Sequence, residues 1–300
     1  MTPASPWLGR APGRVNLIGE HVDYAGGRVL PCAIDRFVSA RGDRAQRWWM
    51  ESEVEGGTPY LTALGHELGV GPQRVQVTSN LPAGAGLASS AALLVACTRG
   101  LAPGLEGARA ALIGQRAEQR ATGVMVGAMD HFVSALGRRG HAMLLDCSTF
   151  EYRQVPLPEG IAIAIVDSGL RRQVSRSEYG LRRQEVLSGD ARRLRHVESE
   201  NARVTAFVAA MESGDLKAMG ELLGLSHASL RDDFEVSRPE LDEIVARATA
   251  SAGCLGARLI GAGFGGSVLA LLEAGSEARF EARLGGWPVQ FCRTADGAFA

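Results

Sequence analysis

The sequence predicts a protein of mixed helices and strands in two domains. The chain has 300 residues, 46% of them hydrophobic, which is enough for a sizeable core and, at roughly 100 to 200 residues per domain, for two domains. Short β-branched runs alternate with segments whose apolar residues recur at helical spacing. Pro156, Pro158 and Gly160 interrupt the chain near its midpoint, so we expect domains at residues 1–158 and 159–300.

The first half is expected to contain short strands followed by helices. Strands are predicted at residues 29–33, 37–40, 75–79 and 141–146 from their apolar and β-branched residues. Helices are predicted from residue 58, where a threonine and a proline can begin one, at residues 89–97 and 105–122, and after residue 130.

The second half is expected to be mainly helical up to residue 250. Strands are predicted at residues 161–166, 257–260 and 268–272, the last two on either side of a glycine cluster. SRPE, residues 237–240, has the serine and glutamate of a capping box at the start of a helix.

Composition favours a small-molecule partner. Thirty-two basic and 33 acidic residues give a net charge of −1, so no long-range field attracts nucleic acid or an acidic membrane. No apolar run reaches the roughly 18 residues of a membrane span, and the N-terminus lacks a signal-peptide pattern. Five scattered cysteines suggest buried thiols in a reducing compartment. We expect a cytoplasmic protein with no nucleic-acid or membrane partner.

LPAGAGLASSA, residues 81–91, is the clearest candidate for a phosphate site. Gly84 and Gly86 follow a predicted strand, and Ser89 and Ser90 open a predicted helix. Backbone N–H groups at such a turn can approach an anion closely, and the helix dipole favours negative charge. The alternative for this segment is a tight structural turn.

Other phosphate motifs fit less well. Lys217 is the only lysine, so no glycine turn ends in the Gly-Lys-Ser/Thr of a Walker loop. GAGFGGSV, residues 261–268, literally matches the protein-kinase and dinucleotide glycine patterns. The kinase pattern needs later lysine, HRD and DFG elements, and the dinucleotide pattern needs a following helix. A strand is predicted there instead, which leaves a nucleotide-dependent oxidoreductase as a minor alternative.

Several motifs together resemble the GHMP kinases and, within them, the galactokinase branch. GRVNLIGEHVDYAGG, residues 13–27, looks like the galactokinase signature, and LPAGAGLASSA and GAGFGGS follow in the family's order. GVMVGAMDHF, SRSEYGLRRQE and SHASLRDDFEVSRPELD are also similar to galactokinases, so the resemblance covers nearly the whole chain. It implies a two-lobed α+β fold, with a ribosomal protein S5 domain 2-like N-terminal lobe, a ferredoxin-like C-terminal lobe and an active site between them.

The resemblance implies an enzyme that uses ATP and Mg²⁺ to phosphorylate the anomeric hydroxyl of galactose or a galactose-like sugar. Close alternatives are kinases for a galactosamine derivative, arabinose, galacturonate or a heptose. An alternative of another class is a non-catalytic sugar sensor, against which the presence of the catalytic-type residues argues. A monomer is favoured, although the sequence leaves the oligomeric state open.

The same resemblance assigns residues to the nucleotide and the metal. The phosphate loop that would bind ATP comprises Pro82, Ala83, Gly84, Ala85, Gly86, Leu87, Ala88, Ser89, Ser90 and Ala91. The hydroxyl of Ser90 and the carboxylate of Glu118 would hold Mg²⁺, which prefers hard oxygen ligands. Because this loop has no lysine, positive charge must come from Mg²⁺ and arginine.

Three residues match catalytic positions of the family. Asp130 matches the aspartate that removes the proton from the attacking sugar hydroxyl, with a helix cap as the alternative role. Arg14 matches the arginine that flanks it, where a fixed positive charge would keep the carboxylate ionised and steady the phosphate. Arg171 matches an arginine near the transferred phosphate, with its neighbour Arg172 as the alternative.

Sugar contacts are implied for seven residues: Arg14, Glu20, His21, Asp23, Gly127, Asp130 and Tyr179. Glu20, His21 and Asp23 are also compatible with a metal site, but the resemblance favours hydrogen bonds to sugar hydroxyls. The sequence departs from the family at His131, where galactokinases usually carry glutamine, and at GAGFGG, which is more often GGGFGG. We expect His131 to pack as a neutral core histidine. The chain is also shorter than typical galactokinases.

Overall fold

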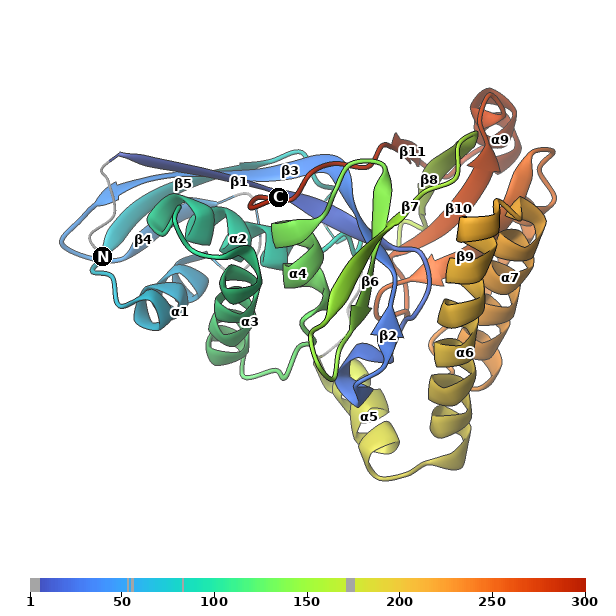
Figure 1. Cartoon of the computed structure of the whole chain (residues 1–300), viewed down its shortest axis with the longest axis horizontal. Coiled ribbons are helices and arrows are strands. Elements are labelled where there is room, and N and C mark those ends of the chain that lie inside the picture. Colours follow the sequence, from blue (N-terminus) through green and yellow to red (C-terminus); the bar gives the residue numbers. More distant parts are fainter. Residues whose placement is uncertain (1–5, 53, 55–56, 83, 171–175) are drawn as a thin grey trace.

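The computed structural model describes all residues except 1–5, 53, 55–56, 83 and 171–175. In this part of the chain, helices and three sheets form an elongated molecule (Figure 1). None of the described helices combines the length and hydrophobicity that a membrane span requires. All five cysteines are free thiols and four are buried, which agrees with the expected absence of disulfides.

The first half is built on a four-stranded sheet covered by helices. Its strands are β1 (Trp7–Asn16), β3 (Pro31–Arg44), β5 (Gln73–Ser79) and β4 (Trp49–Ser52), in the order β1-β3-β5-β4. The helices α1 (Gly57–Leu68), α2 (Ser89–Leu101), α3 (Gly107–Thr122) and α4 (Met129–Leu136) lie on one side of it (Figure 1). A register shift between Pro12 and Arg14 bends β1, as a bulge does where a side chain must be re-aimed.

The second half is built on an antiparallel sheet of four strands. These are β11 (Val289–Cys292), β8 (Ile161–Asp167), β10 (Ser267–Glu273) and β9 (Cys254–Ile260), in that spatial order. The helices of this half are α6 (Ala191–Ser213), α7 (Leu216–Asp232), α8 (Pro239–Thr249) and α9 (Glu277–Leu284). Because α7 and α8 pack on β9, the glycine cluster between β9 and β10 is held at one end of a buried hairpin.

Smaller elements lie between the two halves (Figure 1). β2 (Arg28–Val29), β6 (His141–Asp146) and β7 (Tyr152–Pro156) form a three-stranded sheet. The short helix η1 (Asp23–Ala25) contacts α5 (Arg176–Leu187) below this sheet. The chain then returns from β11 to the first half, where the N–H of Phe299 donates to the carbonyl of Ala135.

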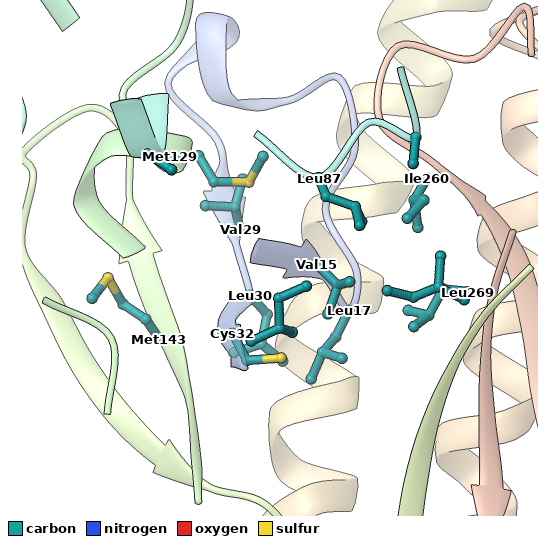
Figure 2. Packing of buried hydrophobic residues seen from close by; sticks show 14 of the residues in the cluster. Val15, Leu17, Val29, Leu30, Cys32, Leu87, Met129, Met143, Ile260 and Leu269 are labelled. Atoms are coloured by element: carbon teal, nitrogen blue, oxygen red, sulfur yellow. The ribbon is translucent and has the colours of Figure 1, made fainter. Parts of the chain in front are cut away.

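The hydrophobic core continues from one half into the other. Figure 2 shows Val15 and Leu17 between Met129 on one side and Leu269 on the other. All of these side chains are buried. The end of β1 is therefore packed from both halves, and the loop that follows it begins at a rigid point.

Most expected elements are present, but three expectations were wrong. The strands expected at 29–33 and 37–40 are mostly one long strand, β3, because the polar residues between them still pair with β1 and the C-terminal segment. The capping box at 237–240 is absent, since Arg238 is the N-cap and Ser237 donates to Asp242. Asp130 lies inside the first turn of α4, whose N-cap is Ala128. The division at residue 158 stays a prediction.

Candidate active site

A cavity of roughly 180 Å³ lies where the two halves meet. It is smaller than the ~300–1,000 Å³ typical of pockets for drug-sized ligands, and most of its wall is polar or charged. The lining residues are Arg14, Glu20, His21, Asp23, Glu118, Val126, Gly127, Met129, Asp130, His131, Tyr179, Gly261 and Ala262. The cavity thus suits a small molecule with many hydroxyl groups.

Arg14 joins the cavity to the phosphate loop. Its Nε and Nη2 donate to the two carboxylate oxygens of Asp130 at 2.8 Å each, and its Nη1 donates to the carbonyl of Gly86 at 2.6 Å. Arg14 is buried, and such two-pronged pairs hold both planes in a fixed orientation. A carboxylate and the glycine-rich loop are therefore placed on the same guanidinium group.

The phosphate loop turns its carbonyls toward the protein. The N–H of Arg14 donates to the carbonyl of Leu87, and the buried hydroxyl of Ser267 donates to that of Ala85 at 2.9 Å. Gly84 and Gly86 have positive φ angles of 71° and 77°, which glycine adopts without strain. Orienting the carbonyls inward in this way favours an outward direction for the N–H groups.

The helix that follows this loop has no side-chain cap. Its N-cap, Ala88, has a left-handed conformation with φ 61° and makes no side-chain hydrogen bond. A non-glycine residue pays a cost of roughly 1 kcal/mol there. The first N–H groups of α2 consequently stay available for an anion, as the sequence predicted for residues 81–91.

Glu118 is a buried carboxylate in α3 that reaches the same cavity. Burial raises its pKa, but the neighbouring groups His131, Ser90 and Arg14 outweigh burial and lower the pKa overall. The group is therefore ionised at neutral pH, and the Ser90 hydroxyl is close to it. This pair of oxygen donors fits Mg²⁺.

Asp23 and Gly127 form the opposite wall. A Cβ atom on Gly127 would lie 1.6 Å from Oδ2 of Asp23, so only glycine fits beside this carboxylate. Burial, followed by the charge of Asp130, raises the pKa of Asp23 to about 7. Two carboxylates that face one small cavity repel each other unless hydroxyl donors or a proton compensate them.

Aromatic side chains line the rim next to Asp23. The Nε2 of His21 is 3.2 Å from the carbonyl of Ala262 and its Nδ1 is 3.2 Å from the hydroxyl of Tyr24. Because a carbonyl only accepts, Nε2 carries the proton and Nδ1 accepts from Tyr24. The ring of Tyr179, from α5, lies 5.7 Å from that of Tyr24, and burial raises the pKa of the Tyr179 phenol, so it stays a neutral donor.

The loop after β1 is fixed by the second half of the chain. Oε1 of Glu20 accepts from the N–H of Gly261 at 2.8 Å. The fully buried guanidinium of Arg258 donates to the carbonyls of Asn16 and Leu17. Glu200, also fully buried, accepts from the N–H of Gly19 at 2.9 Å.

The structure brings together eight of the residues that the sequence analysis singled out: Arg14, Glu20, His21, Asp23, Glu118, Gly127, Asp130 and Tyr179. Arg171 and Ala83 lie outside the described residues. Sequence reasoning missed Gly261 and Ala262 as part of this wall. Their place in the third glycine motif was the available signal, but nothing in the sequence connected it with residues 20 and 21.

Three family models match the chain. The galactokinase galactose-binding signature matches residues 2–41, the GHMP kinases N terminal domain matches residues 59–138 and the GHMP kinases C terminal model matches residues 207–286. A galactokinase of Roseiflexus sp. (strain RS-1) is 38% identical, with 90% of this chain and 84% of that protein aligned.

Solved structures agree with these matches. The galactokinase of Lactococcus lactis, in a complex with galactose, has a TM-score of 0.89 and 27% identity, covering 98% of this chain and 94% of that one. The mevalonate kinase of L. major, in a complex with R-mevalonate, has a TM-score of 0.80 and 19% identity over 99% and 100% of the two chains; at that identity the likeness concerns the fold. The chain belongs to the GHMP kinases, in the galactokinase family.

Proposed function

We propose that this protein transfers the γ-phosphoryl group of ATP to the anomeric hydroxyl of galactose, giving galactose 1-phosphate and ADP. The observation that carries the proposal is the position of Arg14, whose guanidinium binds both Asp130 and the carbonyl of Gly86. A base for the sugar and a loop for the phosphates are thereby held side by side. Family membership supports the use of ATP, and the galactose in the Lactococcus lactis relative supports the sugar.

In this mechanism Asp130 accepts the proton of the sugar's anomeric hydroxyl as its oxygen bonds to the γ-phosphorus. The bond between the γ-phosphorus and the β–γ bridging oxygen breaks, and that oxygen leaves on ADP. Arg14 fixes the direction of the Asp130 carboxylate. Uncapped N–H groups at the start of α2 bind phosphate oxygens, since such transfers depend chiefly on positioning and charge stabilisation.

Glu20, His21, Asp23, Gly127 and Tyr179 would bind the sugar. The carboxylates of Glu20 and Asp23 can accept from ring hydroxyls, and the phenol of Tyr179 can donate. Because the pKa of Asp23 is raised to about 7 by burial and by Asp130, hydroxyl donors from a sugar would stabilise its ionised form. Binding energy for the sugar thus comes from groups that are poorly satisfied without it.

Ser90 and Glu118 would hold the Mg²⁺ ion. When bound, the ion supplies positive charge for the β- and γ-phosphates. The ionised, buried Glu118 beside a serine hydroxyl at the helix start is a hard-oxygen donor set of the right kind.

The experiment is ADP release with Mg-ATP against galactose, galactosamine, arabinose, galacturonate and mevalonate. The proposal predicts turnover with galactose and a fall in kcat of about 10²–10⁴-fold in Asp130→Ala, the usual contribution of a general base. Sugar binding without turnover of any substrate would favour a sensor. Unchanged release in Asp130→Ala would remove that residue from the mechanism.

A further inference from the structure

His131 lies in the active-site cavity without a role in the proposed mechanism. It follows Asp130 in α4, is 1% exposed and lines the cavity together with Glu118. Among the described residues, neither ring nitrogen has a hydrogen-bond partner. A buried polar group left unsatisfied costs about 1–3 kcal/mol, which indicates that a ligand completes this site.

The contact between His131 and Glu118 has the spacing of two metal ligands. Nε2 of His131 lies 3.0 Å from Oε2 of Glu118, yet the two groups are not aligned as a hydrogen bond. Donor atoms about 2.1 Å from one octahedral ion and at right angles to each other are about 3.0 Å apart. One cation can therefore accept both atoms without a change in their separation.

Gly114 provides the space for the imidazole ring. A Cβ atom at this position would lie 3.0 Å from Cδ2 of His131. Gly114 precedes Glu118 by four residues in α3, so both face the same side of the helix. The helix that carries the carboxylate thus also leaves room for the histidine beside it.

A third donor comes from the phosphate loop. The Ser90 hydroxyl is close enough to Glu118 to lower the pKa of its carboxyl group. The described residues hold no cluster of three His, Cys, Asp or Glu side chains arranged for a metal, so a serine hydroxyl has to complete a set of three protein ligands.

We propose that His131 is a direct ligand of the nucleotide-associated cation, together with Ser90 and Glu118. The cation site then prefers first-row transition metals such as Mn²⁺ to Mg²⁺, because imidazole suits those ions better than it suits Mg²⁺. The proposal rests on the proposed function, in which a cation accompanies ATP. A glutamine at this position, as galactokinases usually have, would supply only an amide oxygen.

The test is pulsed electron paramagnetic resonance of the full chain with Mn²⁺ and ADP. Wild type should show ¹⁴N coupling from a directly bound imidazole, and labelling with ¹⁵N-histidine should convert that coupling to ¹⁵N. His131→Gln should lose the coupling, whereas the exposed His66 serves as the control, because His66→Gln should keep it. Bound Mn²⁺ without nitrogen coupling in wild type, or with coupling retained in His131→Gln, overturns the proposal.

Cation affinities give a second measurement on the same proteins. We expect His131→Gln to weaken Mn²⁺ binding about 10-fold or more, the scale of change that metal-site substitutions produce, and to weaken Mg²⁺ binding much less. Equal losses for both ions would overturn the assignment. Turnover of galactose with Mg-ATP but no nitrogen coupling removes the His131 ligand and leaves the kinase function. Nitrogen coupling without turnover of any sugar removes the kinase function and leaves the cation site.

Discussion

Gly127 shows how one atom shapes the sugar pocket. The carboxylate of Asp23 occupies the place where a Cβ atom of residue 127 would be, 1.6 Å away. Any side chain at residue 127 must displace this carboxylate, which lines the cavity with Asp130.

We therefore expect Gly127→Ala to raise the KM for galactose by about 10-fold or more, since a misplaced hydrogen-bond partner costs at least ~1.4 kcal/mol. The KM for ATP should change much less. Steady-state kinetics with each substrate varied in turn measures both values. Gly104→Ala is the control, because nothing lies within 4 Å of a Cβ atom there; equal effects of the two substitutions would contradict this explanation.

Asp23 links the pocket to stability through its charge. Its pKa is about 7 in the folded protein and 3.8 as a free side chain, so ionisation of Asp23 opposes folding. The free energy of unfolding should fall as the pH rises from about 4 to 7 and lose nothing more from this group above pH 7.

Asp23→Asn removes this dependence. Above pH 7 we expect the variant to be more stable than wild type by roughly 1–3 kcal/mol, with the difference shrinking toward pH 4. Urea unfolding at pH 4.5, 6 and 8 measures it. The same variant should bind galactose poorly. A stability difference that does not vary with pH would show that Asp23 is not the cause.

At the scale of elements, the phosphate loop depends on a strand from the other half of the chain. Ser267 opens β10, is fully buried and donates to the carbonyl of Ala85. Arg14, at the other side of the loop, donates to Gly86. The two donors together fix the loop between β1 and β10, so the third glycine motif acts on the phosphates through Ser267.

Ser267→Ala should accordingly raise the KM for ATP several-fold while sugar affinity stays nearly unchanged. Its matched control is Ser134→Ala, because Ser134 is also fully buried and donates to a backbone carbonyl, that of Pro12. Both variants should lose about 1 kcal/mol of stability. Nucleotide kinetics and thermal unfolding separate the two effects. If both serines changed the KM for ATP equally, the loss would be general destabilisation.

At the scale of the whole molecule, each half of the chain completes the other. Arg258 and Glu200 hold the loop after β1 from the second half. Residues after β11 return to the first half, where Phe299 lies under the guanidinium of Arg99 at 5.1 Å. The core passes between the halves without a break (Figure 2). Neither half is therefore expected to fold well alone.

Unfolding should then be a single cooperative transition. Removal of residues 294–300 should lower the Tm of this transition by several degrees, because it exposes the apolar surface that Phe299 covers. Circular dichroism and loss of kinase activity, followed in the same urea series, should coincide. Two separated transitions would contradict the description of one shared core.

Motifs and local periodicity predicted the identity of the site better than its assembly. The loop at residues 81–91 and Asp130 stand out because their chemistry is local. The roles of Arg258, Glu200 and Ser267 depend on contacts more than 180 residues apart, which no periodicity encodes. Similarly, β3 is one strand because its polar residues find partners in β1 and the C-terminal segment, and propensity cannot register such partners.

The central claim is that Arg14 and Asp130 direct a phosphoryl group from ATP to the anomeric hydroxyl of galactose. The most direct measurement is ³¹P nuclear magnetic resonance of a reaction with Mg-ATP and galactose labelled with ¹³C at carbon 1. The account predicts a new phosphomonoester signal coupled to that carbon, formed by wild type and at least ~10²-fold more slowly by Asp130→Ala. A phosphoester on any other carbon, or ADP without a sugar phosphate, would contradict it.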